Sequence, residues 1–228
     1  MAESVSYRSI IVVSQYLSWF FGQIIRARYS IRAHLPAGLF ERNSEHCLIL
    51  ASNHQTFLDP LLLMIAVDCR CWRALIPVRT LGTQNFNSPL LQWFKPVIKI
   101  IYWLGGVIEL PPDDNDDRSL PEKLRGLLVA LNEGDVVAIF PEGEVWRRRE
   151  PAIGEFASGV VYLHRKAAAP IVPIAVWISG QKWPRRRYVV QFGLPLRIPD
   201  DLDQDAGAVW LREQVLALHG AAKQREER

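Results

Sequence analysis

The 228-residue sequence contains few cysteines, and their arrangement excludes a zinc site of the usual kind. Cys47, Cys69 and Cys71 are an odd number and lack the spacing of paired metal ligands. Cys47 lies in an apolar run, where a free thiol is expected to be buried. These features favour a reduced protein that faces the cytoplasm.

The sequence also lacks a large excess of charge of one sign. It has 27 Lys and Arg against 24 Asp and Glu, a formal net charge of +3, which is well below that of a general nucleic-acid-binding protein. Basic residues do cluster at 147–149 and 185–187, and an acidic run covers 113–117. Solvated loops and local binding sites are equally good interpretations of these clusters.

Several catalytic signatures are absent. There is no Gly-x-Ser-x-Gly sequence of a serine hydrolase, no P-loop and no dinucleotide fingerprint. The histidines show no pairing at metal-ligand spacing; they are His34, His46, His54, His164 and His219. We therefore expect neither a metal nor a cofactor.

No apolar stretch is clearly long enough to span a bilayer. The longest, Ile10 to Ile25, is mainly apolar and is followed by Arg26 and Arg28, but a span needs roughly 20 apolar residues and a cleavable signal carries its charges in front. We favour an interfacial or partly inserted helix over a soluble helix packed on the domain. The sequence thus predicts a membrane-associated helix over 1–30, on the cytoplasmic face, followed by a catalytic domain over 31–228.

Short apolar runs alternate with amphipathic stretches along the rest of the chain. The predicted strands are Leu48 to Ala51, Ala74 to Val78, Gly106 to Leu110, Val136 to Phe140, Ile171 to Ile178 and Tyr188 to Phe192. The predicted helices are Leu61 to Val67, Pro89 to Trp103, Arg118 to Asn132 and Phe156 to Ala168, with a frayed tail from Lys223 to Arg228. This alternation predicts a single α/β domain with a largely parallel central sheet flanked by helices, whose site lies beyond the carboxyl ends of the strands.

A histidine and an aspartate follow the first predicted strand, in the sequence Asn53-His54-Gln55-Thr56-Phe57-Leu58-Asp59-Pro60. Side chains five residues apart on a regular helix point to different faces, so His54 and Asp59 can meet only if the segment turns. A carboxylate bonded to one ring nitrogen would leave the other nitrogen as a base. Alternatively, Asp59 is only the N-cap of a helix that begins at Pro60, and His54 is a polar turn residue.

A carboxylate follows a second strand, in Ile139-Phe140-Pro141-Glu142-Gly143, which could also be a plain turn. Taken together with Gly106-Val107-Ile108 and with Ala169-Pro170-Ile171-Val172-Pro173-Ile174, these blocks resemble the glycerolipid acyltransferase family, which includes the lysophosphatidate acyltransferases. The resemblance covers roughly residues 47–178. Its first block, Asn-His with an aspartate five residues past the histidine, and its third, Phe-Pro-Glu-Gly, are complete.

The resemblance implies a direct acyl transfer from acyl-CoA or acyl-carrier protein to a lysolipid, most simply a 1-acylglycerol-3-phosphate. His54 is implied to deprotonate the acceptor hydroxyl, and Asp59 to orient its ring. The resemblance also implies that Asn53, Gly106, Glu142 and Gly143 help to bind the acceptor. A backbone N–H near Gly143 is implied to stabilise the oxyanion. The Val172-Pro173 block is implied to line the acyl channel or to support the sheet.

Two departures from the family pattern bear on phosphate binding. Pro112 stands where the family commonly has an arginine, and Glu144-Val145-Trp146 replaces its Thr-Arg-Ser. We therefore expect Arg79 or the run Arg147, Arg148 and Arg149 to supply cationic donors to the acceptor phosphate, and the run to contact the donor phosphates. Another lysolipid acceptor, a thioesterase and a non-catalytic lipid-binding protein remain alternatives.

Overall fold

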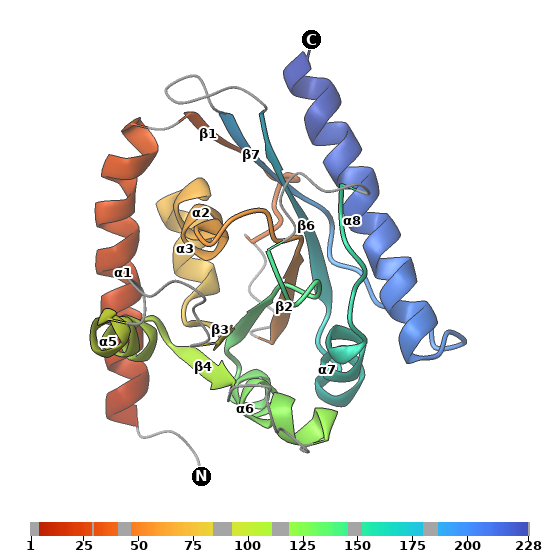
Figure 1. The fold of residues 1–228 in the computed structure, drawn as a ribbon, viewed down its shortest axis with the longest axis horizontal. Coiled ribbons are helices and arrows are strands. Elements are labelled where there is room, and N and C mark those ends of the chain that lie inside the picture. Colours follow the sequence, from red (N-terminus) through yellow and green to blue (C-terminus); the bar gives the residue numbers. More distant parts are fainter. Residues whose placement is uncertain are drawn as a thin grey trace.

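The strands of the protein form one sheet in a computed structural model that describes residues 5–28, 30–40, 47–83, 93–110, 119–145, 152–179 and 187–227. The strands are β1 (Ser30–His34), β2 (Leu48–Ser52), β3 (Val78–Thr83), β4 (Val107–Leu110), β5 (Val136–Ile139), β6 (Ile171–Ile178) and β7 (Arg187–Phe192). Their order in the sheet is β1-β7-β6-β2-β5-β3-β4, and every neighbouring pair is parallel except β6 and β7 (Figure 1). The predicted α/β fold with a largely parallel sheet is confirmed.

Helices cover both faces of this sheet. They are α1 (Val5–Arg28), α2 (Asp59–Ala66), α3 (Cys69–Leu75), α5 (Lys95–Gly105), α6 (Leu120–Asn132), α7 (Gly159–Ala167) and α8 (Gln204–Glu227). Figure 1 shows α1, α2, α3 and α5 on one side and α6, α7 and α8 on the other. Side chains along each strand alternate between the faces, so Ile49 packs in the cluster beneath α6, α7 and α8, whereas Leu50 packs beneath α2 and α3.

Some sequence predictions of elements are corrected by the structure. The run Ala74 to Val78 is not a strand: Asp68 accepts a hydrogen bond from the Cys71 N–H (2.8 Å) and caps α3, so the run contains the end of a helix, and β3 starts only at Val78. The charged tail from Lys223 is not frayed as far as Glu227, because α8 continues there and Glu226 binds Arg32 (2.9 Å). Strand β1 and the long helix α8 were not predicted.

Helix α1 packs directly on the domain that follows it. The Gln15 side chain accepts from the Val78 N–H (3.0 Å) and donates to the Val78 carbonyl (2.6 Å), so it binds the backbone at the start of β3. Arg8 forms an ion pair with the buried Asp135 (2.6 Å), and Trp19 donates to the Val67 carbonyl (3.2 Å). Within the range 1–30 predicted to be helical, the structure thus has a helix over Val5–Arg28, and this helix packs on the residues from 31 onward. Among the described helices, none combines the length and apolarity needed to cross a membrane.

Candidate active site

His54 and Asp59 meet at the carboxyl end of β2, where the strand gives way to α2. His54 Nδ1 lies 2.8 Å from Asp59 Oδ2, and the two side chains are 16% and 0% exposed. The turn that was required for this contact spans residues 53–58, and Asp59 is the first residue of α2 while Leu58 occupies the N-cap position. Because Nδ1 is held by the carboxylate, Nε2 is the ring nitrogen left for a proton of a substrate.

The Asp59 carboxylate is held by the turn that it closes. It accepts hydrogen bonds from the backbone N–H of Gln55, the backbone N–H of Thr56 (2.8 Å) and the Thr56 hydroxyl (2.9 Å), in addition to the His54 ring. These hydrogen bonds fix the position of the carboxylate beside the His54 ring. Asp59 can therefore act both as the anchor of the turn and as the partner that would stabilise a protonated His54.

The Phe-Pro-Glu-Gly block follows β5, the neighbour of β2, and lies against the His54 turn. The ring of Phe140 stacks on the His54 ring, with centroids 4.5 Å apart and planes inclined by 27°. The Glu142 carboxylate accepts the His54 N–H at Oε2 (2.7 Å) and the Gly154 N–H at Oε1 (2.8 Å). Glu142 thus links two backbone segments. The sequence predicted a contact of Glu142 with the acceptor and did not predict this link.

Burial raises the pKa of Glu142, while the two backbone hydrogen bonds, from His54 and Gly154, oppose this rise. Both carboxylate oxygens already serve backbone N–H groups. These two donors favour the charged form and so act against the effect of burial on the pKa of Glu142.

Asn53 lies in the sheet rather than facing a substrate. It is fully buried, its Nδ2 donates to the Val176 carbonyl (3.0 Å) and its Oδ1 accepts the Val176 N–H (2.7 Å). The side-chain amide therefore continues the pairing of β2 with β6 beyond the end of β2. The expected contact of Asn53 with substrate is corrected to a structural role.

Gly143 has a positive φ of +70°, which explains why a glycine suits the turn. Its N–H donates to the Phe140 carbonyl (3.0 Å), so this N–H closes the turn. The oxyanion donor expected near Gly143 stays a prediction.

Two predicted substrate-binding residues, Arg79 and Gly106, lie near the amino ends of β3 and β4, away from the carboxyl ends where His54 lies. Arg79 does not follow a strand but lies at the start of β3, level with Val137, where it is 3% exposed and its Nε is 3.9 Å from Asp135. Gly106 ends α5 with a φ of +72°, and a Cβ there would come within 3.2 Å of the Arg79 guanidinium. The premise that placed Arg79 at the active edge is wrong. Arg147, Arg148, Arg149 and Pro112 lie outside the described residues.

An apolar cavity of about 340 Å³ opens beside the His54 turn. Phe57, Pro60 and Leu61 line it next to the dyad, and Gly105 and Ala138 line it farther along the sheet. Val172 and Pro173 are not among the described lining residues, and Val172 is fully buried beneath α2. Of the two roles expected for this block, support of the sheet is the one that the burial fits.

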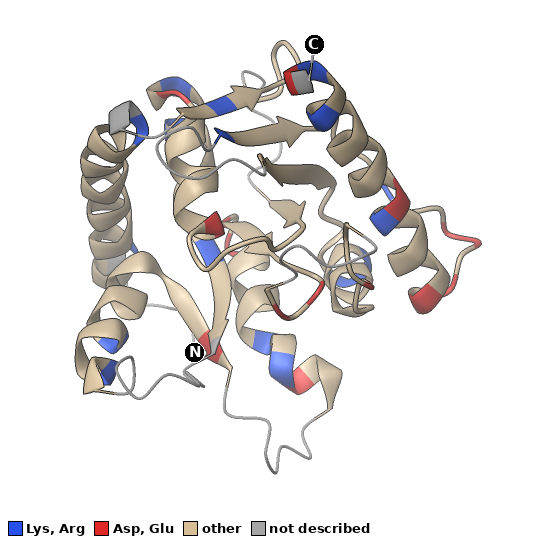
Figure 2. Cartoon of the chain, turned by 45° about the horizontal axis from the view of Figure 1, so that its top comes forward, with Lys and Arg blue, Asp and Glu red and all other residues tan. Residues whose placement is uncertain are grey.

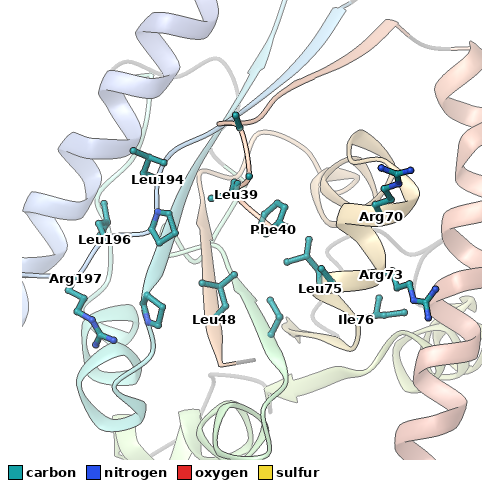
Figure 3. A pocket seen from close by; sticks show the side chains of 16 residues that line it. Leu39, Phe40, Leu48, Arg70, Arg73, Leu75, Ile76, Leu194, Leu196 and Arg197 are labelled. Atoms are coloured by element: carbon teal, nitrogen blue, oxygen red, sulfur yellow. The ribbon is translucent and has the colours of Figure 1, made fainter. Parts of the chain in front are cut away.

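A larger hollow of about 900 Å³ lies at the other end of the strands (Figure 3). Leu48, Val136 and Pro170, at the starts of β2, β5 and β6, line it. Its cationic side chains do not gather at one place: Figure 3 shows Arg197 on one side of the hollow and Arg70 and Arg73 on the other. This hollow is therefore separate from the His54 and Asp59 site.

The described residues contain no group of three or more His, Cys, Asp or Glu side chains that could hold a metal ion. The ionisable side chains that the structure brings together at the site are His54, Asp59 and Glu142. Residues at or near the site that the sequence did not single out are Thr56, Phe140 and Arg212. The first two lie inside the recognised blocks, where their position could have indicated them. Arg212 lies on α8 and binds the carbonyls of Ile153 and Gly154, more than 50 residues away in the sequence. No motif or spacing near Arg212 indicated this contact.

The sequence is similar to those of known acyltransferases. A sequence model of the family described as "Acyltransferase" matches residues 26–177, well over half of the chain. The chain is 28% identical over 143 residues to the 1-acyl-sn-glycerol-3-phosphate acyltransferase BAT2, chloroplastic, of Brassica napus; the match covers 62% of this chain and 36% of that protein. The chain thus spans about a third of the length of this curated relative.

The fold is also similar to a solved structure. The crystal structure of the 1-acyl-sn-glycerophosphate (LPA) acyltransferase PlsC from Thermotoga maritima superposes with a TM-score of 0.62 at 12% sequence identity, over 94% of this chain and 81% of that one. At this identity the likeness concerns the fold.

Proposed function

The chain belongs to the acyltransferase family, and from that premise we propose that it transfers a fatty acyl group from a thioester to the hydroxyl of a lysolipid. The observation that carries the proposal is the His54 and Asp59 contact of 2.8 Å at the carboxyl edge of the sheet. The activities named for the Brassica and Thermotoga proteins support a 1-acylglycerol-3-phosphate-type acceptor. The thioester is that of acyl-CoA or acyl-carrier protein.

The proposed reaction is a direct transfer with His54 as general base. Nε2 of His54 takes the proton of the acceptor hydroxyl while the oxygen forms a bond to the thioester carbonyl carbon. The carbon–sulfur bond then breaks, and the imidazolium gives its proton to the leaving thiolate. Asp59 stabilises the imidazolium between these steps, and general-base catalysis of this kind contributes about 10²–10⁴-fold.

The apolar cavity supports a place for the acyl chain. It lies between the sheet and helices α1, α2 and α5, and its entrance residues Phe57, Pro60 and Leu61 adjoin the His54 turn. A hydrocarbon chain in this cavity would bring its carbonyl carbon to the dyad. Burial of each methylene group contributes about 0.8 kcal/mol, so the cavity also accounts for binding energy remote from the reacting bond.

An exposed apolar surface supports association with a membrane, and we place the protein on the cytoplasmic face as part of the proposal. Large apolar side chains are exposed on α1, on α5 with the two residues before it, and on the His54 turn; they are Ile10, Val13, Leu17, Phe20, Phe21, Ile24, Ile25, Trp93, Phe94, Val97, Ile100, Ile101, Trp103, Phe57 and Leu58. We call this set the apolar face. Most of α1 is tan in Figure 2, and α5 carries the basic Lys95 and Lys99. Apolar side chains with basic residues nearby suit the boundary between acyl chains and anionic headgroups.

One assay tests the proposal. Purified protein in detergent is given acyl-CoA or acyl-carrier protein together with each of a panel of lysolipids, and the products are read by mass. We expect a diacyl product that requires the lysolipid and is lost in His54→Ala. Acyl release that is independent of any lysolipid would instead identify a thioesterase, and no turnover with any pair would support the lipid-binding alternative.

A further inference from the structure

The Arg212 side chain of helix α8 binds the backbone of a loop beside the site. Its Nε donates to the Gly154 carbonyl and its Nη2 to the Ile153 carbonyl, both at 2.7 Å. Residue 212 lies beyond the region 26–177 that the family model matches. The contact therefore joins a part of the chain outside that region to a loop beside the dyad.

The peptide group between Ile153 and Gly154 is held at both of its polar ends. Its carbonyl oxygen accepts from Arg212, and its N–H donates to Glu142 Oε1 at 2.8 Å. In a planar trans peptide these two groups point in opposite directions, so Arg212 and Glu142 lie on opposite sides of it. A glycine follows the peptide group, and glycine allows a peptide to rotate at little steric cost. Without an anchor on the carbonyl, rotation could turn that oxygen toward the Glu142 carboxylate.

Glu142 connects this peptide group to the His54 turn. Its second oxygen accepts the His54 N–H at 2.7 Å, one residue after the end of the Asn53 pairing with β6. We propose that Arg212 is a positioning residue of the site: it fixes the peptide group between Ile153 and Gly154, and through it the Glu142 carboxylate and the His54 turn. The effect on turnover rests on the proposed function, whereas the effect on the hydrogen bonds does not.

The loop has other anchors, so it should stay in place when Arg212 is removed. Ile153 and Phe156 are buried in the core cluster with Leu211 and Val215 of α8, and the Gln55 side chain donates to the Ala152 carbonyl (3.2 Å). Loss of Arg212 is therefore expected to free the orientation of one peptide group rather than to unfold the loop.

The test compares Arg212→Ala and Arg212→Lys with Glu213→Ala, a change at the exposed neighbouring residue of α8. Amide hydrogen exchange, read by NMR in the full chain, is expected to become about tenfold faster at Gly154 and His54 in Arg212→Ala, as for the loss of a hydrogen bond to a charged group, and to stay unchanged in Glu213→Ala. Arg212→Lys keeps the positive charge but replaces the two donor nitrogens of the guanidinium with one ammonium nitrogen, so it should lie between. If Arg212→Ala does not fold, Arg212→Lys decides the matter.

Turnover supplies the second measurement. We expect Arg212→Ala to lower kcat about tenfold with KM for both substrates nearly unchanged, and to add little to the loss already caused by Glu142→Gln. Independent, additive losses would overturn the proposed route through Glu142. Unchanged exchange at Gly154 and His54 would overturn the proposal whether or not the wild-type protein transfers acyl groups.

Discussion

The ring of Phe140 lies against the ring of His54 with centroids 4.5 Å apart. Since Asp59 fixes only one ring nitrogen, the stacked phenyl ring is what restrains the tilt of the imidazole. Aromatic pairs of this kind are worth about 1 kcal/mol beyond their area. We expect Phe140→Leu to lower kcat roughly fivefold with KM little changed, and steady-state kinetics with saturating donor would measure both.

Replacement of the dyad should separate chemistry from folding. His54→Ala is expected to lower kcat by about 10²–10⁴-fold while its thermal unfolding midpoint stays close to that of the wild type. Asp59→Asn keeps the size of the side chain and removes its charge, so it should lose activity with a modest loss of stability. Asp59→Ala leaves the donors of Gln55 and Thr56 without an acceptor and should be clearly less stable. An active His54→Ala variant would contradict the proposed base.

The apolar cavity offers a test of chain-length selection at Gly105. A Cβ there would meet only Val107 Cγ2, at 3.7 Å, so a side chain can enter without a clash at its base. Gly105→Leu should lower kcat/KM for long acyl donors about tenfold or more relative to short ones, since a few methylene groups lose their place. Gly105→Ala is the matched control. Equal losses for all chain lengths would show that the acyl chain lies elsewhere.

Two valines of similar exposure test the apolar face. Val97 on α5 is 51% exposed and Val209 on α8 is 56% exposed, but only Val97 belongs to the apolar face. Val97→Ser should weaken sedimentation with vesicles of anionic and zwitterionic lipid severalfold, because a buried valine contributes about 1.5 kcal/mol. Val209→Ser should leave it unchanged. The reverse order would place the lipid contact on α8.

Stability should depend on pH through His219. Burial lowers the pKa of His219, and the positive charge of Lys223 acts in the same direction. As the pH falls through the ordinary value of 6.5, the unfolded chain takes up a proton that the folded chain does not, so the free energy of unfolding falls. His219→Gln should remove this part of the decline between about pH 7.5 and pH 5.5. Chemical denaturation of both proteins at each pH would measure it, and the opposite contribution of the raised pKa of Glu142 cancels in the comparison.

The sequence predicted the dyad because its residues are local. His54 and Asp59 are separated by one turn, and the strand before them and the helix after them have clear patterns. Glu142 was found through its motif, but its partners were not, since the Gly154 N–H belongs to a loop without periodicity.

Predictions failed where the local pattern was ambiguous or the contact was distant. A short apolar run such as 74–78 fits a strand and the end of a helix equally well. The strand prediction put Arg79 just after a strand, whereas it is the second residue of β3. Arg212 and the Val176 partner of Asn53 depend on the order of strands and helices in space, which residue spacing does not contain.

One side of helix α1 packs on the domain, and the other side is exposed. Gln15 binds the start of β3 and Arg8 binds Asp135, just before β5, while Phe20 and Ile24 remain exposed. Anything that binds the exposed side of α1 only when the chain is folded adds RT ln(1 + [L]/Kd) to the free energy of unfolding. A lipid surface that binds this helix is therefore expected to stabilise the folded domain. Protein released from that surface should be cleaved faster by a protease.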